Sequence, residues 1–450
     1  MACQRIVRAG SVIALLSGIF WLAPLPVLAA DYYVHPTSGT DSGPGSKSRP
    51  FRTIARINAL NPNPGDRILF ARGMNFTGAL VIRASGSSQQ PIIVTAYGAG
   101  TAPRLLNPRF GLEKGRIVSV YGAHVVVENL YLYDTPTPPP DDPPLGWKES
   151  HQHKLVTEMA AVFVDRDASY VVVRNCEFVN TPIGIRLRGQ YSKALNNYLH
   201  DASKITEYWG AIAIAVVGPH NEVAYNRIEN IGYYGGAYVD DGAAVELDGE
   251  DQAFDAHHTN VHHNISRNTK GGFLEIAGNT HDVEIAYNVS DDVDKFVGTN
   301  GIANLSIMNN TIIRQRIPDI SADDFWSFRS LLWSICFNGC EGDRDSNVMV
   351  AGNVFVTTAI HRIYLGVDNP NGFMSARHRD NLYFSPDGDG ARLLGQPLGP
   401  GEQITPVSFR NPGAWDYRLI GASGFGAYKA GEPLWHAGLT RNVGGVGRPD

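Results

Sequence analysis

The sequence DDGAAVELDGEDQAFDAHHTNVHHNISRNTKGGFLEIAG, residues 240–278, contains the patterns that determine the fold. Two segments in it, AAVELDG at 243–249 and GFLEIAG at 272–278, share the order apolar, acidic, apolar, small or acidic, Gly. Alternate residues of a strand face opposite sides, so Glu246 and Glu275 would point away from the apolar residues beside them. In neighbouring parallel strands the two glutamates would lie side by side, with backbones about 4.8 Å apart. Like charges at that spacing are unfavourable unless something compensates for them or uses them.

Between these two segments lies NVHHNISR, one copy of a phrase that recurs along the chain: apolar, x, apolar, two residues, Asn, x, apolar. The asparagines of the copies are Asn129, Asn175, Asn197, Asn226, Asn264, Asn288, Asn310 and Asn353, with a weaker copy at Asn381. The shortest interval is 22 residues, and three short strands in such a period are typical of a parallel β-helix. One coil cannot bury its apolar face alone, whereas stacked coils share a continuous core. The asparagines are expected at a corner with left-handed backbone, each bonding the equivalent asparagine above and below.

The sequence therefore predicts an all-β fold, a right-handed parallel β-helix formed as a single-stranded solenoid. A β-sandwich would require hairpin turns and regular polar alternation, which fit this sequence poorly. We expect the parallel β-helix with its N-terminal helical cap at 31–395 and a C-terminal capping segment at 396–450. The cap would include a helix at about 51–60 that covers the open end of the first coil.

Residues 1–30 have the features of a secretory signal peptide. Arg5 and Arg8 precede an apolar run at 12–22, and small residues follow. Without this segment the chain has 36 basic and 44 acidic residues, a net charge of −8. We therefore expect an exported protein, periplasmic or secreted, that does not bind nucleic acid, has no membrane span and acts as a monomer. Cys176 is expected in a buried strand, and a Cys336–Cys340 disulfide is left open.

Aligned on their glycines, four segments form an outward-facing ladder: IGIRLRG at 183–189, IAIAVVG at 212–218, AAVELDG and GFLEIAG. One predicted row consists of Arg186, Ala213, Glu246 and Glu275, and the second of Arg188, Ala215, Asp248 and Ala277. Lys295 of the next coil would reach this level, and Asp240 and Asp241 would enter from the preceding loop.

Clustered carboxylates in an open groove suggest glycoside hydrolysis. Inverting enzymes need two carboxyl groups roughly 6.5–9.5 Å apart, one to protonate the leaving oxygen and one to activate water. The predicted catalytic set is Glu246, Glu275, Asp248 and Asp241, with Asp248 and Glu275 on a diagonal of about 7–8 Å.

The same groups allow two other interpretations. Asp240, Asp241 and Glu246 could hold Ca²⁺, with Arg188, Lys270 or Lys295 as the base of a β-elimination on a uronate. Alternatively, the acidic strand is simply solvated and paired with Lys295 and Arg186. The hydrolase interpretation requires no cofactor.

Long insertions interrupt the coils and should wall one side of this groove. The predicted substrate-binding residues are the cations on the ladder and the aromatic residues of the insertions, which suit stacking on sugars: Arg186, Arg188, Lys270, Lys295, Tyr233, Tyr234, Trp209 and Trp147. These aromatic residues could equally pack their own loops. His257, His258, His262 and His263 crowd one coil, as a hydrogen-bonded set or as a metal cluster.

Two resemblances extend this interpretation. PFRTI at 50–54 and PGD at 64–66, after a strand and a Gly-rich loop, resemble the N-termini of secreted, pectin-lyase-like β-helix carbohydrate-active enzymes. DDG at 240–242, GGF at 271–273, His281 and NNT at 309–311 resemble the pectate lyases of polysaccharide lyase family 9.

The second resemblance implies that Asp240 and Asp241 are calcium ligands. The position of that family's catalytic lysine holds Leu274 or Glu275, and a further calcium aspartate is replaced by Ala243 or Ala244. The resemblance thus supports the place of the groove and favours carboxylate chemistry over the lyase reaction. We expect an enzyme that degrades an extracellular polysaccharide or oligosaccharide, preferably by hydrolysis. The alternatives are a Ca²⁺-dependent polysaccharide lyase and a non-catalytic glycan-binding or surface-structural β-helix.

Overall fold

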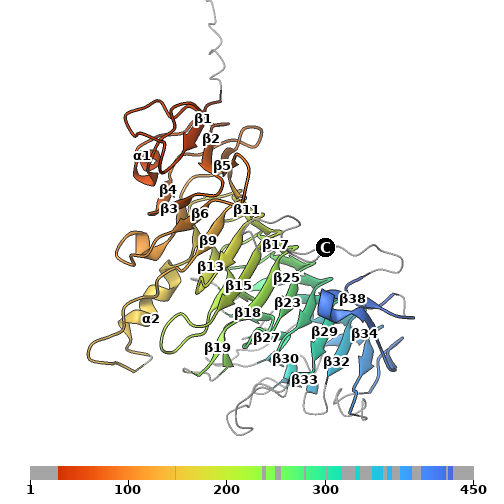
Figure 1. The fold of residues 1–450 in the computed structure, drawn as a ribbon. Helices are drawn as coiled ribbons and strands as arrows, with labels where there is room; N and C mark the ends of the chain where they lie inside the picture. The colour runs from red at the N-terminus through yellow and green to blue at the C-terminus, as the bar shows by residue number, and fades with distance from the viewer. Residues whose placement is uncertain are drawn as a thin grey trace, which may run out of the picture.

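The chain is a parallel β-helix (Figure 1) in a computed structural model. Described residues are 29–146, 148–235, 240–248, 255–277, 280–299, 303–316, 330–334, 347–357, 362–366, 376–387, 397–421 and 424–428. Most of the predicted signal peptide, Trp147, Cys336 and Cys340 lie outside these ranges. Within them, no helix has the length and apolar character that crossing a membrane requires.

Three long parallel sheets run the length of the molecule, and the chain visits them in the order sheet 1, sheet 2, sheet 3. Sheet 1 consists of β4 (Leu80–Ile82), β7 (Val118–Val120), β10 (Val162–Val164), β13 (Ile183–Leu187), β16 (Ile212–Val216), β21 (Val245–Leu247), β24 (Leu274–Ile276), β27 (Val297–Thr299), β30 (Ser330–Ser334) and β33 (Arg362–Gly366). Sheet 2 consists of β1 (Asp31–Val34), β2 (Arg67–Ala71), β5 (Ile92–Tyr97), β8 (Val125–Glu128), β11 (Val172–Arg174), β14 (Lys193–Leu195), β17 (Glu222–Ala224), β22 (Asn260–His262), β25 (His281–Ala286), β28 (Ala303–Met308), β31 (Met349–Ala351) and β34 (Arg377–Arg379). Sheet 3 consists of β3 (Asn75–Thr77), β6 (Arg104–Leu106), β9 (Tyr131–Tyr133), β12 (Glu177–Val179), β15 (Tyr198–Ala202), β18 (Arg227–Ile231), β23 (Ile265–Arg267), β26 (Val289–Asp291), β29 (Thr311–Arg314), β32 (Val354–Thr357), β35 (Leu382–Phe384) and β36 (Gln403–Ile404). The fold class predicted from the 22-residue repeat is confirmed.

A continuous ladder of buried asparagines joins the coils at the corner between sheets 2 and 3. Its members are Asn197, Asn226, Asn264, Asn288, Asn310, Asn353 and Asn381, all with 0% exposure. Each side-chain amide from Asn197 to Asn353 donates to the Oδ1 of the next asparagine at 3.0 Å. Burying an amide without hydrogen-bond partners costs free energy, so these mutual hydrogen bonds offset the cost of a polar row inside the core.

The prediction that the repeated asparagines have left-handed backbone is correct only for Asn129 and Asn175, whose φ angles are 60° and 53°. In later coils the left-handed residue is the one before the ladder asparagine, such as Asn196 or Tyr225. The sequence alignment therefore treated two adjacent corner positions, the left-handed residue and the ladder residue after it, as one. The ladder position next to Asn175 holds Cys176, whose backbone amide donates to Asn197 Oδ1 at 3.1 Å.

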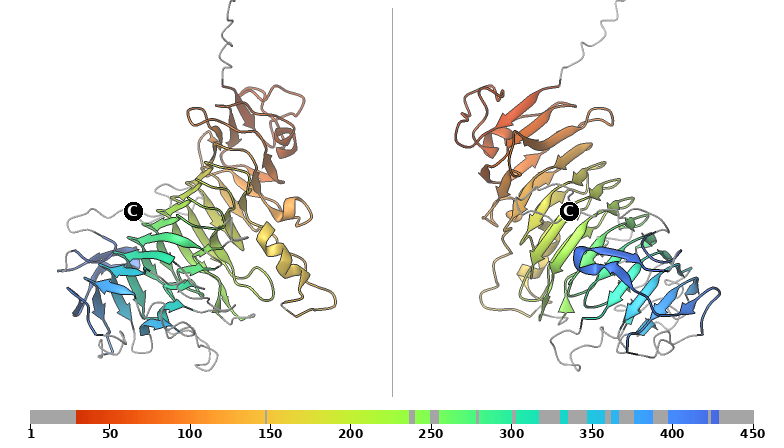
Figure 2. Two further views of the ribbon diagram at one scale, coloured as in Figure 1. Left: turned by 180° about the vertical axis from the view of Figure 1, so that it is seen from behind. Right: turned by 45° about the vertical axis from the view of Figure 1, so that its right-hand side comes forward.

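Additional segments cover the solenoid at its N-terminal end and along one side (Figure 2). The predicted N-terminal helix is α1 (Ile54–Asn58), which begins after the Thr53 cap and buries Ile54 and Ile57. The hairpin β37 (Phe409–Asn411) and β38 (Asp416–Leu419) lies along the outer face of sheet 3, where Tyr417 joins an apolar cluster with Ile265 and Val289. A 3₁₀ turn, η4 (Pro412–Ala414), connects the two strands.

Several insertions directly precede or follow strands of sheet 1 in the chain. Those after β9, β15, β18 and β29 lead from sheet 3 into sheet 1, and those after β21 and β30 lead out of it. The first carries α2 (His151–Leu155) and the 3₁₀ turn η2 (Val156–Glu158), while η1 (Glu113–Gly115) precedes β7. The third carries the hairpin β19 (Tyr233–Tyr234) and β20 (Asp240–Asp241). Most of the insertions in this fold are therefore connected directly to strands of sheet 1.

Candidate active site on sheet 1

The outer face of sheet 1 presents one residue per strand in a continuous row. Strand pairing aligns Arg186 with Ala215, Ala215 with Glu246, and Glu246 with Glu275. The predicted row therefore holds, with one correction: Ala215, not Ala213, lies between the arginine and the first glutamate. Backbone hydrogen bonds extend the register to a second row of Arg188, Val217, Asp248 and Ala277, where Val217 replaces the expected Ala215.

Glu246 and Glu275 are register partners on adjacent strands, as the repeated pattern predicted. Their neighbours Val245, Leu247 and Leu274 have 0% exposure in the core, whereas both glutamates lie partly exposed on the outer face. The Glu275 side chain is 43% exposed. The two carboxylates thus share one open position of the sheet, although their chemical roles remain predictions.

Lys295 supplies the positive charge at this position. Its ammonium lies 3.5 Å from Glu275 Oε2 and 3.3 Å from Asp294 Oδ2, and only 7% of its side chain is exposed. The ring of Trp333 lies on its other side, with the centroid 5.7 Å from Nζ. A compensating cation was expected beside the acidic pair, and this one is held inside the face rather than in bulk solvent.

Glycine creates the space for this lysine. Gly298 is the register partner of Glu275 and Trp333. A Cβ at Gly298 would lie 2.6 Å from Lys295 Cδ and 2.7 Å from Cε. The lysine stem therefore crosses the sheet face where a side chain is missing.

The turn that carries Lys295 rests on Arg314, which is fully buried. Its guanidinium donates to the backbone oxygens of Ser290 (2.8 Å), Lys295 (3.0 Å) and Asp294. Burial lowers the pKa of Arg314, although Asp292 and Asp294 oppose the shift. A buried network beneath the turn thus holds the backbone from which the Lys295 side chain extends.

The hairpin β19–β20 borders the glutamate pair on the sheet 3 side. Its pairing sets the backbone of Asp241 opposite Tyr233 and that of Asp240 opposite Tyr234, directly before β21. Lys270 lies nearby, with Nζ 4.8 Å from the Tyr234 ring centroid and 3.1 Å from Asn268 Oδ1. Burial, together with the charge of Arg316, lowers the pKa of Lys270.

The half of the face over β10, β13 and β16 is closed by insertions. Arg186 is 4% exposed and donates to the backbone oxygens of Met159 (3.3 Å) and Val156 (3.1 Å). Trp209 stacks on His153 with ring centroids 4.0 Å apart and packs against the apolar cluster around Phe163. Arg186 is therefore not placed to contact a substrate, and Trp209 mainly packs its own loop.

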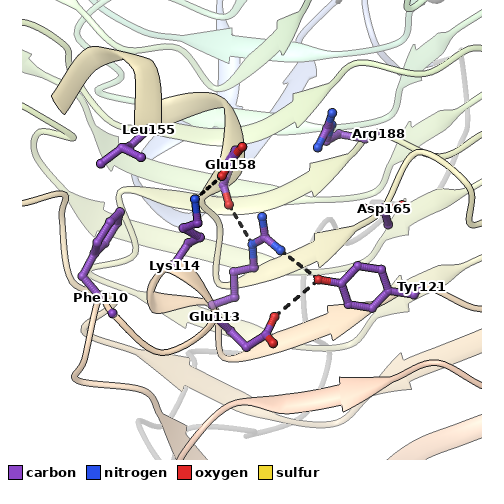
Figure 3. A pocket seen from close by; sticks show the side chains of 10 residues that line it. Phe110, Glu113, Lys114, Tyr121, Leu155, Glu158, Asp165 and Arg188 are labelled. Atoms are coloured by element: carbon purple, nitrogen blue, oxygen red, sulfur yellow. Dashed lines mark hydrogen bonds and ion pairs between the residues drawn. The ribbon is translucent and has the colours of Figure 1, made fainter. Parts of the chain in front are cut away.

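Beside this closed region lies a pocket of about 640 Å³, shown in Figure 3. Its lining residues are Phe110, Gly111, Glu113, Lys114, Arg116, Tyr121, Leu155, Glu158, Asp165 and Arg188. Tyr121, Asp165 and Arg188 directly follow β7, β10 and β13 and precede Asp248 in the second outward row. The pocket and the acidic pair therefore belong to the same face.

A dense polar network shapes the pocket. Arg116 Nε donates to Glu158 O at 2.7 Å, and its Nη1 donates to the Tyr121 hydroxyl at 3.2 Å. That hydroxyl donates in turn to Glu113 Oε2 at 3.4 Å, and Lys114 pairs with Glu158. Burial lowers the pKa of Arg116 and raises the pKa of Tyr121.

The backbone at this wall is strained. Glu113 and Lys114 have φ angles of 48° and 55°, a conformation that non-glycine residues rarely adopt. Sequence patterns missed the pocket because 107–117 and 134–161 follow no repeat; among its residues only Arg188 was predicted.

The sequence and the structure were compared with those of known proteins. No protein-family model and no curated protein matches the sequence. The structure of XylC in complex with xylose is 9% identical, with a TM-score of 0.53 over 84% of this chain and 87% of that one. The PL6 family alginate lyase AlyGC, as a point mutant, is 14% identical, with a TM-score of 0.52 over 86% and 58%. A GH136 lacto-N-biosidase from Eubacterium ramulus is 14% identical, with a TM-score of 0.43 over 78% and 67%.

This chain thus spans little more than half the length of the alginate lyase. At these identities the likeness concerns the fold, and it agrees with the strand order described above. The protein therefore has a parallel β-helix fold, which it shares with the PL6 family alginate lyase.

Proposed function

We propose that this protein is an exported polysaccharide-degrading enzyme that hydrolyses glycosidic bonds on the outer face of β21 and β24. One observation carries the proposal: Glu246 and Glu275 are register partners, partly exposed, with a buried ammonium 3.5 Å from one of them. A merely solvated strand has no need of a cation held inside the sheet face.

The asymmetry of the pair suggests distinct roles. The Lys295 ammonium lies 3.5 Å from Glu275 Oε2, so we assign Glu275 as the nucleophile or base and Glu246 as the general acid. Glu246 then carries the proton that goes to the leaving glycosidic oxygen as the C–O bond breaks. In hydrolysis the anomeric carbon takes the hydroxyl of water, and the other water proton goes to a carboxylate.

The partner of Glu275 determines the stereochemistry. Adjacent parallel strands lie about 4.8 Å apart, close to the 5–5.5 Å carboxyl separation of retaining enzymes, whereas inverting enzymes need roughly 6.5–9.5 Å. Glu246 with Glu275 thus suits retention, and Asp248 with Glu275, on the diagonal, suits inversion. The anomer released first, measured by NMR, distinguishes the two pairs.

The pocket in Figure 3 would bind a sugar unit along the same face. It combines three cations, three carboxylates and the rings of Phe110 and Tyr121. Such a balanced polar lining with aromatic faces suits a neutral, hydroxyl-rich sugar. The names of two structures with the same fold, one bound to xylose and one an alginate lyase, support a carbohydrate ligand.

A Ca²⁺-dependent lyase is the second candidate. Lys295 on the face and the lowered pKa of Lys270 favour it, because β-elimination on a uronate requires a base. The residues proposed to hold Ca²⁺ are Asp240, Asp241 and Glu246, which supply the oxygen ligands that this ion prefers.

A polysaccharide screen with two readouts separates these reactions. Hydrolysis releases reducing ends alone, whereas elimination also creates an unsaturated product that absorbs in the ultraviolet. Glu275→Gln should lower the rate roughly 10²–10⁴-fold, the usual contribution of a general acid or base, with the fold retained. Glu284→Gln is the control, since Glu284 is exposed on sheet 2. Intact glycan binding without any chain shortening, in both wild type and variants, would instead indicate a glycan-binding protein.

A further inference from the structure

A second cluster of titratable side chains lies away from the acidic pair, at the corner between sheets 1 and 2. Three consecutive coils contribute to it: His220 precedes β17, His257 and His258 precede β22, and His281 begins β25. Backbone hydrogen bonds align these turns, because His220 N donates to His257 O at 2.9 Å and His258 N donates to His281 O at 3.2 Å. The fold thus stacks histidines that are distant in sequence.

The rings of His220, His257 and His258 meet edge to face or at a tilt. His220 lies 4.8 Å from His258, with 33° between their planes, and 5.4 Å from His257, with 74° between planes. One ring nitrogen from each of these three histidines lies within 4.8 Å of the other two. Tetrahedral Zn²⁺ with bonds of about 2.0–2.1 Å requires ligand nitrogens about 3.3 Å apart, so modest ring rotations would complete the geometry.

A buried carboxylate orients one of the rings. Asp255, 3% exposed, accepts from His257 Nδ1 at 2.6 Å and from the His257 backbone amide at 2.9 Å. With Nδ1 bound to the carboxylate, Nε2 of His257 is the nitrogen left for a metal. Carboxylate–histidine pairs of this kind accompany most histidine ligands of metals, where they determine tautomer and ring orientation.

Aromatic stacking explains only part of this arrangement. The stack continues from His220 to Tyr191, Tyr170 and His124 with nearly parallel rings. His257 instead stands almost perpendicular to His220 and His258 and stacks on His281, with centroids 4.8 Å apart.

We propose that His220, His257 and His258 form a binding site for Zn²⁺, with Asp255 as its positioning residue. Three imidazoles suit zinc and related transition metals, whereas Ca²⁺ and Mg²⁺ prefer oxygen ligands. The ion would join two consecutive coils, and its place at the corner separates it from the hydrolysis proposed for sheet 1. His281 and Asp282 form a second carboxylate–histidine pair at 2.6 Å in the next coil.

The test is direct zinc binding by tag-free protein freed of metal, measured by titration calorimetry and elemental analysis. We expect one Zn²⁺ per chain, and Co²⁺ in its place should show tetrahedral absorption bands. His220→Asn and His258→Asn should each weaken binding at least tenfold. Asparagine is chosen because both positions have positive φ angles, 58° and 53°, which it tolerates.

Two further variants sharpen the result. Asp255→Asn leaves all three imidazoles and should weaken binding about 10–100-fold, as loss of such a partner usually does. His124→Asn, also at a positive φ of 52°, removes a ring of the same stack and should leave binding unchanged. No saturable binding, or equal affinity in His258→Asn and His124→Asn with both variants folded by circular dichroism, would overturn the proposal.

Discussion

At the residue scale, the site depends on a glycine as much as on the acids. Gly298→Ala would place a methyl group 2.6–2.7 Å from the Lys295 stem and 3.1 Å from Trp333 Cε3. Because the stem is flexible, we expect the fold to persist while the ammonium moves away from Glu275. The expected result is a fall in kcat of about tenfold or more, with the melting temperature nearly unchanged.

Steady-state kinetics on the substrate identified by the screen measure this effect. Gly413→Ala is the matched control, since a Cβ there approaches nothing closer than 3.5 Å, and its kcat should equal that of the wild type. An unchanged kcat in Gly298→Ala would show that the ammonium has no part in the reaction.

Glu222 makes stability depend on pH. Its carboxylate lies 2.6 Å from Lys193 Nζ and 3.3 Å from His262 Nε2, and these hydrogen bonds, His262 first, lower its pKa to about 2. A lowered pKa stabilises the folded state above the unfolded value, about 4.5, and the benefit disappears as pH falls toward 2. Glu222→Gln should therefore lower the free energy of unfolding by about 1–2 kcal/mol at pH 7.

Urea unfolding at several pH values tests this expectation. The difference between Glu222→Gln and wild type should shrink between about pH 4.5 and pH 2, whereas Glu284→Gln should remain within about 0.5 kcal/mol of wild type at every pH. If the difference in free energy of unfolding between Glu222→Gln and wild type did not depend on pH, the loss of stability would come from packing instead.

At the element scale, the asparagine ladder connects the coils. Asn264 donates to Val223 O at 2.8 Å and to Asn288 Oδ1 at 3.0 Å, and it accepts from Asn226. Asn264→Ala leaves several buried groups without partners, each costing about 1–3 kcal/mol. We expect a loss of about 2–5 kcal/mol in the free energy of unfolding, compared by denaturant titration with Asn75→Ala at an exposed position of β3. A loss no larger than that of Asn75→Ala would contradict the proposed role of the ladder.

Arg186 fastens the insertion that carries α2 and η2. Its guanidinium holds the backbone oxygens of Val156 and Met159, and lysine cannot reproduce this two-armed contact. Arg186→Lys should therefore loosen 134–161 and speed its cleavage in limited proteolysis, with the solenoid intact. Arg174→Lys, on the outer side of sheet 2, should cleave at the wild-type rate. Equal rates in both variants would show that the insertion is held by its apolar contacts.

At the scale of the whole molecule, the two proposed reactions differ in their need for calcium. The hydrolase assignment predicts that chelation with EGTA leaves activity unchanged, because carboxylates and water suffice for hydrolysis. Activity lost with EGTA and restored by Ca²⁺ would establish the lyase alternative. Removal of zinc should lower only the melting temperature, so assays with and without added Zn²⁺ separate the two metals.

The repeat made the solenoid predictable, because the 22-residue interval and the apolar alternation depend on local sequence. The same alignment set Glu246 beside Glu275 correctly. It assigned Asn129 and Asn175 to the ladder, although they lie one position before it, because Leu130 and Cys176 occupy the ladder position in these coils. The slot at Gly298 could not be predicted, because it depends on how the turn before β27 directs the Lys295 stem back over β27 itself.

Cys176 provides the molecule with an internal reporter. Its thiol is completely buried, and burial raises its pKa to about 12, so an alkylating reagent in neutral solution meets neither an accessible sulfur nor a thiolate. Labelling at this position, with Cys336 and Cys340 replaced by serine, therefore requires the coil to separate from its neighbours. The labelling rate would measure how often neighbouring coils of the folded protein separate, in the absence of denaturant.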